Sequence, residues 1–130
     1  MSELAQKKCK ACEGGTLPLT RDAAVALLPQ LDAGWALADD ARSIRRELAF
    51  RDFYRTMSFV NALAHVANIE DHHPDLEVGY NYCRIVFTTH SIKGLSENDF
   101  ICAAKIDLIL RGSRPGGRSD SPGLTPRGLI

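Results

Sequence analysis

The sequence predicts an α+β sandwich in which a helix, two strands, a helix, two strands and a helix follow one another. Two segments repeat apolar residues at helical spacing, a third follows a capping signal at Ser96, and four shorter segments between them alternate or are rich in branched and aromatic residues. The strand-like segments occur as two adjacent pairs, which is typical of antiparallel hairpins with the helices segregated from the sheet.

Capping residues mark the start of the first and last helices. The first helix is expected over residues 22–31, with Thr20 as its N-cap and with Pro29 ending or kinking it. The last helix begins after Ser96. Asp99 follows three positions later, so this start resembles a capping box with aspartate in place of the usual glutamate or glutamine.

The middle helix is predicted to be the longest, from the N-cap Asp52 to about Ile69. Its apolar stripe is wide enough to pack on the sheet and to touch a partner subunit as well. The stripe consists of Phe53, Met57, Val60, Ala64 and Ala67, and Phe59, Leu63 and Val66 widen it.

Four strands are predicted, at residues 35–37, 43–50, 76–80 and 82–89. In the second of them the apolar residues mostly share one parity, as in a half-buried strand, and Arg46 is the exception. Each adjacent pair of strands is expected to form a hairpin.

Length and charge limit the classes of protein to which the chain can belong. Its 130 residues suit a single domain of ordinary globular composition. The 16 basic and 16 acidic residues balance, so net charge favours neither nucleic acid nor an anionic membrane as a partner. No apolar run approaches the roughly 20 residues of a membrane span, and no secretory signal follows the charged start, so we expect a cytoplasmic protein.

Three regions are expected along the chain: an N-terminal arm over residues 1–19, a folded domain over residues 20–110 and a disordered tail over residues 111–130. The arm is polar and is interrupted by glycine and proline. The tail holds five of the ten glycines and three of the six prolines, so it buries too little surface to order itself. Its four arginines leave the rest of the chain acidic.

A single CxxC motif lies in the arm, at Cys9 and Cys12. A zinc site usually needs two such pairs, or one pair with two suitably spaced histidines. The simpler interpretation is therefore two thiols in a mobile arm, and a metal or redox role is the alternative.

Three of the four histidines flank the second hairpin. His72 and His73 follow the middle helix, and His90 follows the last strand. If the hairpin turns near residues 79–81, its two arms are about equal in length at roughly 3.3 Å per residue, and His90 returns to the other two. Such a cluster can transfer protons, bind a metal or simply cap the helix. His65, inside the middle helix, is assigned no chemical role.

Carboxylates close to these histidines either orient an imidazole or remain solvated. Glu70 and Asp71 directly precede His72, and Asp99 combines a structural role at the helix start with a place near His90. No phosphate-binding glycine loop, nucleophile elbow or dinucleotide fingerprint competes with this cluster.

Taken together, these residues resemble the pterin-4a-carbinolamine dehydratases. The likeness is closest over residues 68–107, extends more weakly back to Cys9 and excludes the tail. One position departs from the family pattern: Asn68 stands where an acidic residue is common, so Glu70 or Asp71 would have to replace it, or the acid is dispensable. The residues that match in type and spacing are Asp71-His72-His73-Pro74, Tyr80, Thr89-His90 and Gly94-Leu95-Ser96-Glu97-Asn98-Asp99.

The resemblance implies a four-stranded antiparallel sheet with three helices on one face, assembled as a homodimer or homotetramer. It also implies dehydration of a 4a-hydroxytetrahydropterin to the quinonoid dihydropterin, with no metal or other cofactor, in the pathway of the aromatic amino acid hydroxylases. By position, His72 and His90 are the acid/base pair and His73 binds the pterin, supported by Asp71 and Asp99. The implied substrate-binding residues are His72, His73, Pro74, Thr89, His90, Ser91 and Ile92.

Two other functions stay open at this point. Animal relatives also serve as dimerisation cofactors of a transcription factor, and some bacterial ones are credited with regulatory or assembly roles, so a non-catalytic binding module is the first alternative. The second is a metal-binding protein that uses His72 and His90 with Cys9 and Cys12, although the spacing of these ligands is poor.

Overall fold

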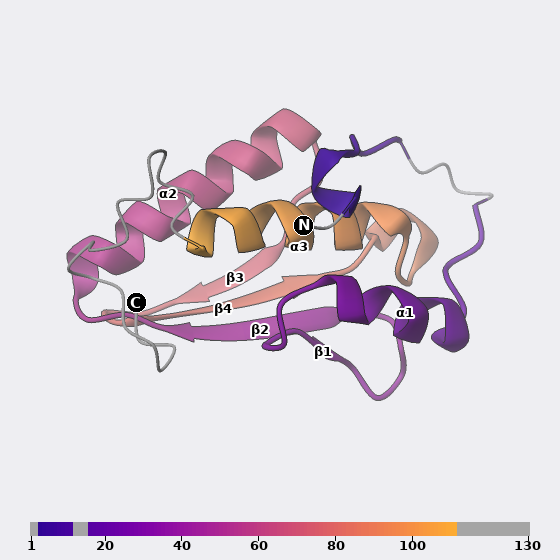
Figure 1. Ribbon diagram of the computed structural model, residues 1–130, viewed down its shortest axis with the longest axis horizontal. Helices are drawn as coiled ribbons and strands as arrows, with labels where there is room; N and C mark the ends of the chain where they lie inside the picture. Colours follow the sequence, from indigo (N-terminus) through magenta and orange to yellow (C-terminus); the bar gives the residue numbers. More distant parts are fainter. Residues whose placement is uncertain (1–2, 12–15, 112–130) are drawn as a thin grey trace.

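The computed structural model describes residues 3–11 and 16–111, and its elements follow the predicted order (Figure 1). Residues 112–130 of the predicted disordered tail and Cys12 lie outside the described residues. None of the helices in the described part of the chain combines the length and apolar character that a membrane crossing requires. The elements are η1 (Glu3–Gln6), α1 (Arg21–Leu27), η2 (Leu28–Gln30), β1 (Ala36–Leu37), β2 (Ile44–Ala49), α2 (Phe53–Glu70), β3 (Asp75–Val78), β4 (Tyr82–Phe87), η3 (His90–Ile92) and α3 (Glu97–Leu110).

The four strands form one antiparallel sheet in the order β1-β2-β4-β3. The central pair runs in register from Ile44 opposite Phe87 to Ala49 opposite Tyr82. β3 pairs only with β4 and forms an edge of the sheet, with all of its residues exposed. Both predicted hairpins are therefore present.

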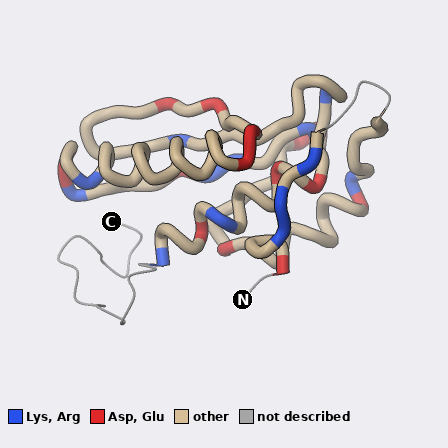
Figure 2. Tube along the Cα trace, turned by 90° about the horizontal axis from the view of Figure 1, so that it is seen from above, with Lys and Arg blue, Asp and Glu red and all other residues tan. Residues whose placement is uncertain are grey.

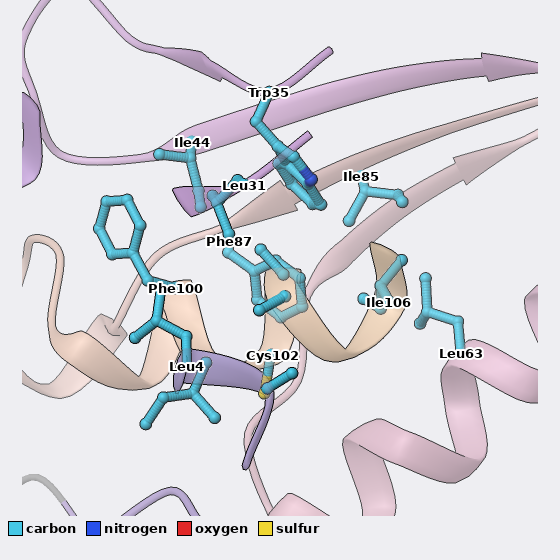
Figure 3. Packing of buried hydrophobic residues seen from close by; sticks show 14 of the residues in the cluster. Leu4, Leu31, Trp35, Ile44, Leu63, Ile85, Phe87, Phe100, Cys102 and Ile106 are labelled. Carbon is cyan, nitrogen blue, oxygen red and sulfur yellow. The ribbon is translucent and has the colours of Figure 1, made fainter. Parts of the chain in front are cut away.

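The two faces of the sheet differ as the alternation predicts. The inner face carries buried side chains such as Ile44, Ile85 and Phe87, and all three helices contribute to the core above it (Figures 1 and 3). The outer face carries exposed charges, among them Arg84, whose Nε donates to Glu47 at 2.5 Å. The predicted arrangement of three helices on one face of the sheet is confirmed.

Local signals set the helix boundaries. Thr20 and Asp52 accept the predicted N-cap hydrogen bonds from the backbone N–H groups of Ala23 and Arg55. α1 ends at Leu27, and the chain tightens there into the 3₁₀ turn η2, which contains Pro29.

The buried face of α2 is rotated from the predicted stripe, and this part of the prediction is wrong. Phe53 is 51% exposed, whereas Phe59 and Leu63, taken only to widen the stripe, are buried at its centre. Thr56 lies on this face, where its buried hydroxyl shares its one hydrogen between the backbone carbonyls of Asp52 and Tyr80, each 2.9 Å away. A buried polar side chain whose hydrogen bonds are made within the protein cannot be predicted from the spacing of apolar residues.

Arg46, the exception to the parity of β2, belongs to a polar cluster within the inner layer. Its Nη1 donates to Asp107 Oδ1 at 2.8 Å and lies 3.3 Å from Asp32 Oδ2. The indole Nε1 of Trp35 donates to the same Asp107 oxygen at 2.7 Å. Burial raises the pKa of the Asp107 carboxyl, while the Trp35 hydrogen bond and the Arg46 charge act in the opposite direction. The cluster ties α3 to the sheet and to the loop before β1.

Removing the carboxylate of this cluster should be strongly destabilising. We expect Asp107→Ala to lower the free energy of unfolding by about 3–5 kcal/mol, because Arg46 and Trp35 would keep buried donors without their shared acceptor. Urea denaturation followed by Trp35 fluorescence measures the loss. Glu47→Ala, which removes a carboxylate from an exposed ion pair on the outer face, is the matched control and should change little. Equal effects of the two substitutions would contradict the assigned role of Asp107.

Candidate active site

A pocket of about 360 Å³ opens where the end of α2, the end of β4 and the N-terminal arm meet. Its volume suits a small organic molecule. His72, His73 and His90 all line it. The other lining residues are Lys10, Ala11, Asp71, Thr88, Thr89, Ser91 and Asn98.

The β3–β4 hairpin brings the histidines together. Asp75 lies opposite Val86, so the segment that precedes β3 lies level with the segment that follows β4. The turn closes where the N–H of Gly79 donates to the carbonyl of Tyr82 at 3.0 Å. Residues 18 positions apart, His72 and His90, therefore line the same pocket.

His72 is the most constrained of the three histidines. Its Nε2 lies 2.6 Å from Asp99 Oδ1, and its ring stacks on Phe87 with the centroids 6.0 Å apart. Its side chain is only 12% exposed. When the Asp99 oxygen is the acceptor of this bond, Nε2 carries the hydrogen, and a neutral ring then has Nδ1 as its acceptor.

Asp99 is fully buried and joins three segments of the chain. Besides His72, it accepts from the Thr89 hydroxyl at 2.8 Å and from the backbone N–H of Ser96 at 3.0 Å, both through Oδ2. The Thr89 and Ser96 hydroxyl oxygens lie 2.7 Å apart. The predicted capping box is present, and the same carboxylate that caps α3 also fixes His72.

His73 is held by the residue that departs from the family pattern. Its Nε2 lies 3.2 Å from the amide oxygen of Asn68 and is exposed. The two carboxylates considered as substitutes have other places: Glu70 accepts from the backbone N–H of Cys9 at 2.9 Å, and Asp71 ends α2 in a left-handed conformation with φ 52°. The carboxylate partner of His72 is instead Asp99.

His90 lies at the mouth of the pocket on the turn η3. Its side chain is 73% exposed, and its Nε2 lies 3.8 Å from Asp75 Oδ2. The loop that carries it is closed by an isolated bridge between Thr89 and Gly94. Of the other residues expected to bind substrate, Ser91 and Thr89 line the pocket, whereas the lining does not include Pro74 or Ile92. Their contact with a substrate stays a prediction.

One wall of the pocket comes from the N-terminal arm, and this contribution was not predicted from the sequence. Leu4 is 2% exposed, and the arm that carries it packs against α3 (Figures 1 and 2). The backbone N–H of Lys10 donates to Asn98 Oδ1 at 3.0 Å, and Asn98 Nδ2 donates back to the Lys10 carbonyl. Lys10 and Ala11 thereby reach the pocket. Within the polar run from Ser2 to Lys10, the adjacent apolar residues Leu4 and Ala5 are a signal from which this packing could have been predicted.

The geometry does not favour the metal-binding alternative. Within residues 3–11 and 16–111, no group of three or more histidine, cysteine or acidic side chains is arranged to hold an ion. His72 is paired with Asp99, and the thiol of Cys9 lies against another cysteine rather than against the histidines.

Comparison with known proteins gives the family. The profile of a family described as Pterin 4 alpha carbinolamine dehydratase matches residues 17–109. The chain belongs to this family. A relative from Nitrosomonas eutropha, named as a provisional pterin-4-alpha-carbinolamine dehydratase, is 58% identical over 108 residues, which are 83% of this chain and 94% of the relative. A relative of the same name from the Corby strain of Legionella pneumophila is 56% identical over 109 residues, 84% and 96% of the two chains.

Solved structures resemble the fold of this dehydratase-family chain. The crystal structure of a transcriptional coactivator/pterin dehydratase from Brucella melitensis superposes with a TM-score of 0.67 and 34% identity, over 71% of this chain and 97% of that one. A pterin dehydratase-like protein identified as a RuBisCO assembly factor in the alpha-carboxysome gives a TM-score of 0.52 at 22% identity, over 60% and 90%. The second likeness shows the shared fold alone.

Asp99 should control both the stability of the pocket and the protonation pattern of His72. In Asp99→Asn, one carboxylate oxygen becomes an NH₂ group, which cannot accept a hydrogen bond from the donors that face Asp99. At least one buried donor then loses its acceptor, so we expect the free energy of unfolding to fall by about 1–3 kcal/mol. We also expect the ¹⁵N spectrum of the His72 ring to change its tautomer signature.

Asp71→Asn is the matched control, since it makes the same chemical change on an exposed carboxylate of the same pocket. It should leave both readouts as they are in the native protein. An unchanged His72 spectrum in Asp99→Asn would contradict the orienting role of Asp99.

Proposed function

We propose that this chain dehydrates a 4a-hydroxytetrahydropterin to the quinonoid dihydropterin and water. The observation that carries the proposal is a single pocket lined by three histidines, one of which is fixed by the buried carboxylate Asp99. Membership of the dehydratase family supports the same reaction.

The reaction needs two proton transfers. The hydroxyl at C4a must gain a proton to leave as water, and N5 must lose its proton as the new C=N bond forms. In our proposal His72 and His90 divide these tasks, and His73 binds the pterin. Asp99 stabilises positive charge on His72 whenever that ring holds the extra proton. General acid–base catalysis of this kind contributes roughly 10²–10⁴-fold to a rate.

The place of the reaction follows from its substrate. A 4a-hydroxytetrahydropterin arises when an aromatic amino acid hydroxylase uses its pterin cofactor, and a reductase must recycle the quinonoid product. We therefore propose that the chain acts in the cytoplasm beside such a hydroxylase. A strain that makes the hydroxylase but lacks this chain should accumulate pterin side products, which chromatography of cell extracts detects.

A non-catalytic partner role is the second candidate. The Brucella relative is described as both a coactivator and a dehydratase, which supports a binding role on the same scaffold. The two candidates differ in one measurement, since a binding module leaves the decay of the carbinolamine unchanged.

Self-association also belongs to the proposal, through the edge strand β3. Leu76 and Val78 are each 38% exposed on the inner face of this edge. Beyond it lies Tyr80, which is 64% exposed and stacks on Phe53 of α2 with the ring centroids 6.2 Å apart. An unpaired edge with exposed apolar groups is a template for pairing with a second copy of the same strand.

The histidine assignment predicts a loss of rate in single variants. We expect His72→Ala and His90→Ala each to slow the enzymatic decay of the carbinolamine by about 10²-fold or more, because each removes one proton-transfer group. Stopped-flow absorbance of freshly formed 4a-hydroxytetrahydropterin is the measurement. His65→Ala, on the exposed side of α2, is the control and should retain full activity. Decay at the uncatalysed rate with the native protein would overturn the whole proposal.

A charge placed on the β3 edge should separate the subunits. We expect Val78→Lys to shift the sedimentation coefficient to that of a monomer, because a desolvated ammonium opposes pairing of the two edges. Val25→Lys makes the same change at an exposed valine of α1 and should leave the assembly intact. A native chain that sediments as a monomer would rule out this association.

A further inference from the structure

Two cysteine sulfurs lie beside the pocket and have no part in the proposed dehydration. The Sγ atoms of Cys9 and Cys102 are 3.6 Å apart. Cys9 lies in the arm and is half-buried, whereas Cys102 lies in α3 and is fully buried (Figure 3). A disulfide is about 2.05 Å long, so the two sulfurs need to approach by about 1.5 Å.

The fold itself holds these sulfurs close together. The backbone N–H of Cys9 donates to Glu70 Oε1 at 2.9 Å. Lys105 donates to the carbonyl of Ala5 at 2.8 Å and lies 3.7 Å from the other Glu70 oxygen. On the other side of Cys9, Lys10 exchanges two hydrogen bonds with Asn98. Cys9 is thus fixed on both sides against α3.

The two cysteines also contact the backbone of residues that line the pocket. Cys102 Sγ lies 3.8 Å from the backbone carbonyl oxygen of His72, and Cys9 Sγ lies 3.7 Å from that of Asn98. Asn98 and the neighbouring Lys10 line the pocket. A bond between the two sulfurs would therefore fasten the arm, and one pocket wall with it, to the helix that holds His72 in place.

We propose that Cys9 and Cys102 form a redox modification site, which a hydroperoxide closes into an intrachain disulfide that locks the arm onto the active-site pocket. The single observation behind it is the contact of a half-buried arm thiol with a buried helix thiol next to His72. This site goes beyond the dehydration and does not depend on it.

The chemistry proceeds in two balanced steps. The sulfur of Cys9, the more accessible of the two, attacks the O–O bond of hydrogen peroxide and becomes a sulfenic acid, with release of one water. Cys102 sulfur then attacks the sulfenic sulfur, and the S–OH bond breaks to release a second water. The two thiols lose two electrons in total, and the peroxide accepts them.

The order of attack follows from the surroundings of each thiol. The hydrogen bond with Cys9 and burial in α3 raise the pKa of the Cys102 thiol, so Cys102 is a poor first nucleophile. It is well placed as the resolving thiol, since its partner sulfur is already in contact. Cys83 is an internal comparison: burial in β4 raises the pKa of its thiol to about 11.

Peptide mapping of the full chain tests the proposal directly. After treatment with hydrogen peroxide and digestion without reductant, mass spectrometry should show the Cys9 peptide joined to the Cys102 peptide, with Cys83 still alkylatable. Dithiothreitol should return both thiols. Because the bond closes a loop of more than ninety residues, the oxidised chain should also melt higher, by a Tm difference on the order of 10 °C.

Variants separate this pairing from its competitor within the CxxC motif. Cys12→Ser should keep the crosslink and the rise in Tm, whereas Cys9→Ser and Cys102→Ala should lose both, and Cys83→Ser is the matched control that keeps both. A Cys9–Cys12 disulfide in the native chain would overturn the proposal. So would oxidation of Cys9 to a sulfinic acid while Cys102 stays a free thiol.

The readouts are masses and melting temperatures, so they do not require pterin turnover. A chain without dehydratase activity that still forms the Cys9–Cys102 bond would sink the proposed function and keep this inference. An active dehydratase that never forms the bond would do the reverse.

Discussion

The carboxylate of Asp99 is the contact on which the pocket depends. It accepts hydrogen bonds from the His72 ring, the Thr89 hydroxyl and the backbone N–H of Ser96. These partners come from the loop after α2, the end of β4 and the start of α3. A buried carboxylate is costly unless donors satisfy it, so all three segments must be in place together. The same group therefore positions the loops that carry His72 and His90.

Much of the fold could be predicted because its signals are local. Thr20 and Asp52 cap helices through bonds to residues three positions away, and the strand pattern needs only neighbouring side chains. The predicted apolar stripe of α2 was wrong because the burial of this helix depends on contacts with distant residues. Thr56 is buried because its hydroxyl reaches the carbonyl of Tyr80, a tertiary contact that no periodicity contains. The place of Arg46 in the inner layer likewise depends on tertiary contacts, with Asp32 and with Asp107, which is 61 positions along the chain.

The candidate site, like the fold, could be predicted from the sequence only in part. The meeting of the histidines could be inferred, since two strands of similar length joined by a short turn return the chain to its start. The identity of the carboxylate was harder, because nothing in the spacing distinguishes Asp99 from Glu70 or Asp71 as the partner of His72. The wall contributed by Lys10 could not be inferred, since its contact with Asn98 joins residues 88 positions apart.

The packing of the arm on α3 has a consequence for the order of events during synthesis. Leu4 and Ala5 are buried against a helix that begins at Glu97, and Lys10 is held by Asn98. A ribosome makes the arm well before that helix, and contacts so distant in sequence must close a long loop to form. The pocket thus takes shape only as the last helix emerges. If a nascent chain stalls before this helix is made, its histidines lack both the contact with Asp99 and the pocket wall that the arm forms.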